Sequence, residues 1–160
     1  MGVKMTTVCY IECDGKYLML HRVKKKNDLN AGKWIGIGGH FLDGESPEEC
    51  MLREVKEETG LSVSEYMYRG IVTFVYDGGF CEYMHLFTAT AFSDSVTDCD
   101  EGELAWIPKD KLPEIPMWEG DKIFIELISR SDTPFFSLKL VYSGVRLLSA
   151  TLNGRTLTVG

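Results

Sequence analysis

The stretch "GGHFLDGESPEECMLREVKEETGL", residues 38–61, decides the fold, and it is crowded with acidic residues. Ser46 is a strong helix N-cap, Pro47 fits the first helical position, and Glu49 completes a Ser-x-x-Glu capping box. Gly60 is suited to the left-handed conformation that ends many helices. These signals predict one helix that begins after Ser46 and ends before Gly60.

The faces of this helix follow from a rotation of about 100° per residue. One arc is apolar and should pack against the rest of the protein: Met51, Leu52 and Val55. The neighbouring arc carries three glutamates: Glu54, Glu57 and Glu58. Like charges at these spacings destabilise an isolated helix by a few tenths of a kcal/mol per pair. The crowding of negative charge therefore needs an explanation.

Two interpretations of the acidic arc remain open from the residues alone. In the first it is a solvated surface, on which Arg53 pairs with Glu57 one turn away. In the second it is a divalent-cation site, because hard cations prefer oxygen ligands and a helix face holds carboxylates rigidly. The Gly38-Gly39 pair just before the helix would let backbone carbonyls approach the same ion.

The bulk composition limits the partners. The chain has 160 residues, and its 17 Lys+Arg against 24 Asp+Glu give a formal net charge of −7. This balance disfavours binding to polymeric nucleic acid, but not to a single nucleotide accompanied by metal ions. Five cysteines without a Cys-x-x-Cys pair favour reduced thiols. With no secretory pattern and no membrane-length apolar run, we expect a cytoplasmic protein without membrane partners.

The rest of the chain indicates a sheet with few helices. Apolar patterns bounded by turn residues predict strands at 6–12, 17–21, 66–76, 81–92 and 104–107, an alternating run at 34–39, and a helix at 118–129. Ser143-Gly144 and Asn153-Gly154 turns divide the tail into a β meander. We expect residues 1–160 to form a single α/β (α+β) domain with a mixed central sheet in an α/β/α sandwich.

The spacing within the opening stretch resembles a known motif. Gly39, Glu45 and the run Arg53-Glu54-Val55-Lys56-Glu57-Glu58-Thr59-Gly60-Leu61 match every fixed position of the Nudix box, here residues 39–61. The resemblance to Nudix hydrolases implies an α/β/α sandwich and a catalyst that hydrolyses a nucleoside diphosphate linked to another group. It also implies Mg²⁺ as cofactor, with Mn²⁺ as the alternative.

Carried over position by position, the resemblance assigns roles to the box. Glu54, Glu57 and Glu58 would be metal ligands together with the Gly39 carbonyl. Arg53 would orient these glutamates and share the catalytic assignment with them, while Glu45 would brace the junction between loop and helix and Gly60 would be structural. A further glutamate from a later loop is expected, with Glu101 as the first choice and Glu103 as the second. The alternative is that both are surface loop carboxylates.

Segments outside the box resemble one subgroup. Residues 32–39, "GKWIGIGG", resemble the GxWxGxGG run of MutT-type enzymes, and so does Trp118-Glu119-Gly120-Asp121. The order of both runs around the box, together with Phe135-Phe136-Ser137, most resembles the bacterial MutX branch. These likenesses imply hydrolysis of 8-oxo-dGTP, or a related purine triphosphate, to the monophosphate and pyrophosphate. The implied partner is a small nucleotide, and the implied protein is a monomer or homodimer.

The same likeness implies a base pocket. Trp118 would stack on the purine, worth roughly 1–3 kcal/mol, and Asp121 would hydrogen-bond the base edge. Phe74 and Met84 would line the pocket, and Lys33 would meet the triphosphate. Each has a plainer alternative: a core tryptophan, a charge favoured by the helix dipole, two sheet-face residues and a solvated lysine.

One residue departs from the subgroup pattern. Vertebrate-type versions of the run at 32–39 carry a base-reading asparagine after the tryptophan, whereas this chain has Ile35, which offers no hydrogen bond. Base selection must then differ in detail or the substrate range must be broader. A Nudix hydrolase acting on ADP-ribose or a dinucleoside polyphosphate is the alternative. A non-catalytic binding module is a third, although it should have lost box glutamates that are all present here.

Overall fold

The computed structural model describes residues 2–23, 30–97 and 102–159. The elements, in chain order, are β1 (Val3–Cys13), β2 (Lys16–His21), β3 (Trp34–Ile35), β4 (Ile37–His40), α1 (Pro47–Thr59), β5 (Ser62–Val75), η1 (Asp77–Gly79), β6 (Cys81–Ser93), β7 (Glu103–Pro108), η2 (Lys109–Glu114), α2 (Glu119–Ile128), β8 (Phe136–Ser143), β9 (Arg146–Leu152) and β10 (Arg155–Leu157).

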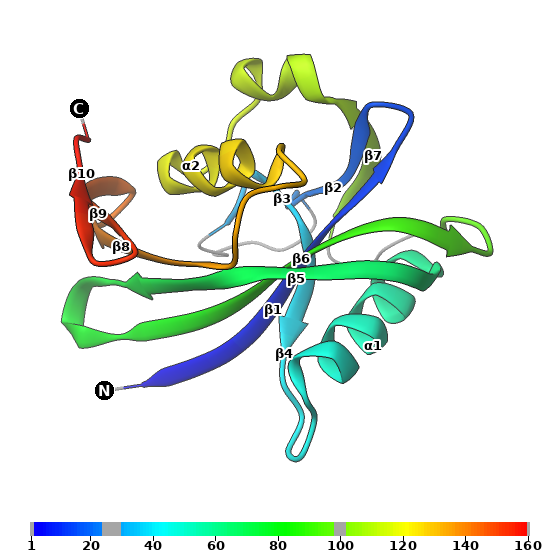
Figure 1. Ribbon diagram of the computed structural model, residues 1–160, viewed down its shortest axis with the longest axis horizontal. Coiled ribbons are helices and arrows are strands. Elements are labelled where there is room, and N and C mark those ends of the chain that lie inside the picture. Colours follow the sequence, from blue (N-terminus) through cyan, green and yellow to red (C-terminus); the bar gives the residue numbers. More distant parts are fainter. Residues whose placement is uncertain (1, 24–29, 98–101, 160) are drawn as a thin grey trace.

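A mixed sheet runs through the middle of the molecule (Figure 1). Its main path is β10-β9-β8-β5-β6-β1-β2-β3, with β4 paired to β1 and β7 to β2. β1 is parallel to β6 and β5 is parallel to β8, while the other pairs are antiparallel. The expected mixed sheet and C-terminal β meander are both confirmed, and the meander β8-β9-β10 extends one end of the sheet.

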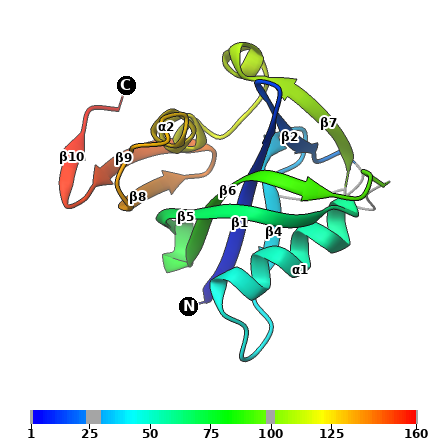
Figure 2. The ribbon, with the colours of Figure 1, turned by 45° about the vertical axis from the view of Figure 1, so that its right-hand side comes forward.

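The two helices cover opposite faces of this sheet, as the views in Figures 1 and 2 agree. Strand alternation explains why both faces are apolar. In β1, Val8 and Tyr10 join the core beneath α2, whereas Cys9 and Ile11 join the core that contains Met51 of α1. The α/β/α sandwich expected from the sequence is therefore confirmed.

One edge of β1 is shared by two strands, and this positions the site. β4 pairs with residues Thr6–Cys9 and β2 pairs with Ile11–Cys13. The alternating run at 34–39 is therefore split rather than continuous: β3 pairs with β2, and β4 pairs with β1. Gly36 lies at the change, where a Cβ would come within 2.6 Å of the Val8 side chain.

Some elements begin at other residues than the sequence predicts. β1 begins at Val3 and β5 at Ser62, each four residues or fewer before the predicted start, and the helix α2 begins one residue after Trp118. The first three residues of β1 are exposed, and β5 begins with the mainly polar run Ser62–Glu65, so neither start carries a buried apolar pattern from which pairing could be predicted. Within the described ranges, neither helix is long and apolar enough to cross a membrane.

Candidate active site

The helix α1 begins and ends as predicted. The Ser46 hydroxyl accepts a hydrogen bond from the Glu49 backbone N–H (3.1 Å), and the Glu49 carboxylate accepts one from the Ser46 N–H (2.9 Å). Gly60 has φ +83° and its N–H donates to the Lys56 carbonyl. A side chain at Gly60 would also meet the Ser95 carbonyl at 2.9 Å. Both ends of the helix are thus fixed, and its glutamates keep a defined direction.

Arg53 is the centre of an ion-pair network. Its Nε and Nη2 donate to the two oxygens of Glu45 at 2.7 and 2.9 Å, and its Nη1 donates to Glu54 (2.9 Å) and Glu57 (3.1 Å). Nη2 also donates to the His40 carbonyl at 2.9 Å. The planar guanidinium can satisfy all these acceptors at once, which an ammonium could not. It offsets the like-charge crowding on this side of the helix.

Glu45 joins the loop to the helix. Besides the Arg53 fork, its Oε1 accepts the Leu42 N–H at 2.7 Å. The Arg53 hydrogen bonds, followed by the Leu42 bond, lower the pKa of Glu45 to about 2. Glu45 therefore remains ionised across the neutral range and holds the loop 41–45 against α1, which is the position expected for a bracing residue.

Glu54 lies directly against Gly39 of β4. A Cβ at position 39 would be 2.4 Å from Glu54 Oε2, so only glycine leaves room for this carboxylate. Beneath them, the Cys50 thiol approaches the Gly39 carbonyl at 3.8 Å and the Thr7 hydroxyl at 3.5 Å. The Glu54 side chain is 14% exposed, whereas that of Glu57 is 59% exposed and rests on Arg53.

These groups suit a hard divalent cation. Glu54 and Glu58 line the same cavity as Gly39 and supply oxygen donors of the kind that Mg²⁺ prefers. The described residues contain no set of three His, Cys, Asp or Glu side chains already close enough to enclose an ion. Mg²⁺ does not require such a cage, because it usually keeps several waters and takes one or two carboxylates plus substrate phosphates. The site therefore fits a cation that arrives with a phosphate ligand.

One cavity of about 810 Å³ joins the Nudix box to the predicted base pocket. Its lining includes Gly39, Glu54 and Glu58 of the box. Its lining also includes the four residues predicted to hold the base: Phe74, Met84, Trp118 and Asp121. The volume is within the range of small-molecule sites in proteins. Two groups of residues that are far apart in sequence thus share one space.

Trp118 is buried and held on several sides. Its indole N–H donates to the Asn30 side-chain oxygen at 2.7 Å, and its ring meets Tyr142 edge-on with 5.1 Å between centroids. The Lys33 ammonium lies 4.8 Å from the ring centroid. Lys33 is not among the described residues that line the cavity. The structure therefore gives it a contact with the Trp118 ring, and its predicted contact with a triphosphate stays a prediction.

Asp121 is only 6% exposed although it bears a carboxyl group. Burial, with a smaller contribution from the charge of Glu82, raises the pKa of Asp121 to about 8. At neutral pH it is therefore mainly a carboxylic acid, which can both donate and accept a hydrogen bond. A neutral group gains little from the helix dipole, so the plainer explanation for this residue is weakened.

The remaining predicted residues are placed as follows. Glu101 lies outside the described residues. Glu103 is exposed at the start of β7, opposite His21, and is absent from the described lining of the cavity. Ile35 does line the cavity and adds an apolar wall, so hydrogen bonds to a base must come from other side chains.

Several lining residues were not expected from the sequence: Thr6, Asn30, Tyr76 and Glu82. Two of them could have been found. Tyr76 and Glu82 lie two residues from Phe74 and Met84, and alternate residues of a strand share a face. Asn30 lies in a turn and follows no pattern that would identify it.

Comparisons with known proteins agree with this arrangement. The sequence profile of the NUDIX domain matches residues 3–128. The oxidized purine nucleoside triphosphate hydrolase of Danio rerio is 32% identical over 127 residues, covering 78% of this chain and 79% of that protein. An uncharacterized Nudix hydrolase of Bacillus subtilis is 28% identical over 134 residues, covering 80% of each. The crystal structure of a MutT protein from Bacillus halodurans superposes with a TM-score of 0.83 at 28% identity, covering 94% of this chain and 97% of that one.

Proposed function

This chain belongs to the Nudix hydrolase family, and on that premise we propose that it hydrolyses an oxidised purine nucleoside triphosphate, 8-oxo-dGTP, to the nucleoside monophosphate and pyrophosphate. Its role would be to keep damaged precursors out of DNA. The oxidized purine nucleoside triphosphate hydrolase of Danio rerio, similar over most of its length, supports this choice of substrate class.

The observation that carries the proposal is the single cavity between the two groups of residues. A nucleotide has a flat apolar base at one end and charged phosphates at the other. The lining of the cavity contains both the aromatic side chain of Trp118, which suits a base, and the box glutamates Glu54 and Glu58, which suit a cation with phosphates. These glutamates would repel phosphates on their own, so a cation between them is required by charge.

The roles of the protein groups follow from the contacts. Arg53 holds Glu54 and Glu57 in place through its 2.9 and 3.1 Å hydrogen bonds, and Glu45 holds Arg53. When bound, Mg²⁺ would neutralise phosphate oxygens and lower the pKa of a coordinated water. Glu54 and Glu58 face the cavity, and one of them would accept the proton of the attacking water.

Water would attack a phosphorus atom in line with the leaving group. One P–O bond forms to the water oxygen, one phosphoric anhydride bond breaks, and the electron pair leaves on a phosphate oxygen. Positioning and charge stabilisation suffice for such a step, so no covalent enzyme intermediate is proposed. Trp118 and Asp121 would fix the base and thereby the position of the phosphates.

The test is pyrophosphate release from 8-oxo-dGTP with Mg²⁺, comparing the wild type with Glu57→Gln. Glu57 is largely exposed, so this substitution should leave the melting temperature nearly unchanged. Glu57 lies outside the described lining of the cavity, but the Nudix box assigns it to the metal, and the loss of this charged ligand should lower kcat on the order of 10²–10³-fold. Glu65→Gln, on the exposed part of β5, is the matched control and should keep full activity. Full activity of Glu57→Gln would contradict the proposed metal role.

A further inference from the structure

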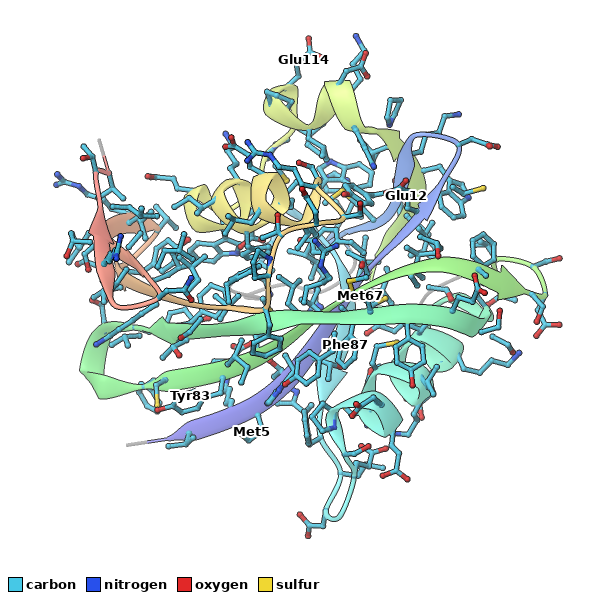
Figure 3. All side chains as sticks on the ribbon, viewed as in Figure 1. Met5, Glu12, Met67, Tyr83, Phe87 and Glu114 are labelled. Carbon is cyan, nitrogen blue, oxygen red and sulfur yellow. The ribbon has the colours of Figure 1, made fainter. Side chains whose placement is uncertain are left out.

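Glu82 is a charged residue in the cavity wall that belongs neither to the box nor to the predicted base pocket. It lies in β6, two residues before Met84, and both line the cavity. Tyr83, between them, is exposed together with Met5, its partner on β1, and both lie on the side of the sheet away from α2 (Figure 3). The alternation of the strand thus directs Glu82 toward the space beneath α2.

The Glu82 carboxylate is held from both sides. The Thr6 hydroxyl donates to Oε2 at 2.7 Å, and the Tyr76 hydroxyl donates to Oε1 at 3.3 Å. An ionised carboxylate has about four acceptor positions on its two oxygens. Each oxygen therefore retains a position for a further donor, and the two donors restrict how far the group can turn.

Asp121 complements Glu82 within the same cavity. Both residues line the cavity, and the charge of Glu82, after burial, contributes to the raised pKa of Asp121. With this raised pKa, Asp121 is mainly protonated at neutral pH and offers an O–H donor. The cavity therefore presents a carboxylate acceptor and a carboxylic acid donor to any base it holds.

We propose that Glu82 is a specificity-determining residue that accepts two N–H groups from the edge of a guanine-type base, with Asp121 hydrogen-bonded to the neighbouring carbonyl. Guanine and its 8-oxo form place N1–H and N2–H side by side, followed by the O6 acceptor. Adenine has a lone pair at N1, which a carboxylate would repel. The inference rests on the proposed function and names the base class that the site selects.

The experiment compares kcat/KM for dGTP, 8-oxo-dGTP and dATP in the wild type and in Glu82→Gln. Glutamine has nearly the same shape, but its amide replaces one acceptor oxygen of the carboxylate with an NH2 donor group. It matches adenine N1 and N6–H better than guanine N1–H and N2–H. The guanine-to-adenine ratio of kcat/KM should fall about 10- to 100-fold. Glu114→Gln, at an exposed position on η2 (labelled in Figure 3) and outside the described cavity lining, should leave the ratio unchanged.

The outcomes separate this inference from the proposed function. A folded Glu82→Gln enzyme whose ratio stays within about twofold of wild type refutes the role of Glu82 but not the proposed activity. A wild-type enzyme that cleaves none of the three triphosphates but cleaves another nucleotide refutes both. Should Glu82→Gln not fold, Tyr76→Phe removes one of the two donors that hold Glu82 and should lower the ratio by a smaller factor, and an unchanged ratio there overturns the inference.

Discussion

Replacing Gly39 with alanine should disable the site without unfolding the protein. A Cβ at this position would lie 2.4 Å from Glu54 Oε2 and 2.5 Å from Cδ. An ordinary contact needs about 3.5 Å, so the Glu54 carboxylate would have to move by about 1 Å. Displacements of this size in a catalytic group can cost on the order of 10²-fold in rate. We therefore expect kcat for pyrophosphate release to fall about 10²-fold.

The stability of Gly39→Ala should change little. Gly39 is not among the residues with positive φ, so alanine can adopt its strand conformation, and the group it displaces is the end of a flexible side chain. We expect the free energy of unfolding to change by less than about 1 kcal/mol. The measurements are steady-state kinetics at saturating Mg²⁺ and thermal unfolding followed by circular dichroism.

Gly38→Ala is the matched control. A Cβ at Gly38 would lie 1.8 Å from the Thr7 carbonyl oxygen, which belongs to the backbone of β1 and cannot move without breaking the β1–β4 pair. The free energy of unfolding of this variant should fall by about 3 kcal/mol or more. The reasoning is refuted if Gly39→Ala keeps full activity, or if both variants are destabilised to the same extent.

Two predictions concern the pH dependence of stability. The pKa of Glu45 is lowered from 4.5 to about 2, so its pairing with Arg53 stabilises the fold above pH 4.5 and is lost as the pH falls toward 2. Glu45→Gln should therefore melt below the wild type at pH 7, and calorimetry should show the gap narrowing between pH 4.5 and 2, whereas a constant gap would contradict the pairing. The pKa of Asp121 is instead raised from 3.8 to about 8, so its contribution is fully present below pH 3.8 and is lost as the pH rises through 8. Asp121→Asn, which cannot ionise, should gain stability relative to wild type between pH 4 and 9 in urea titrations, and parallel pH profiles would show that Asp121 is not protonated in the fold.

Local signals gave the helix of the box with good accuracy because each was a short-range interaction. The capping box at Ser46 and Glu49 and the left-handed Gly60 involve residues within a few positions of one another. The three glutamates could be placed on one arc from helix geometry alone. Helix spacing alone predicts the Arg53–Glu57 pair, and the resemblance implies that Arg53 orients the box glutamates. The contact of Arg53 with Glu45 spans a loop and follows from neither.

Longer-range relations were harder to predict. The run at 34–39 had the pattern of one strand, but its two halves pair with different partners, and nothing in the alternation indicates which edge a strand will join. The prediction of the base pocket rests on the resemblance to MutT-type enzymes and not on any predicted pairing of strands. Glu82 and Asn30 were missed because a carboxylate in a strand and an amide in a turn are most often solvated.

The most direct test of the central claim is a comparison of kcat/KM for 8-oxo-dGTP, dGTP, ADP-ribose and a dinucleoside tetraphosphate with Mg²⁺, with the products identified. The proposed function predicts the highest value for 8-oxo-dGTP, with monophosphate and pyrophosphate as products. Activity confined to ADP-ribose or the dinucleotide would leave the roles of Glu54 and Arg53 standing but contradict the purine triphosphate assignment and the base-reading roles of Trp118 and Asp121.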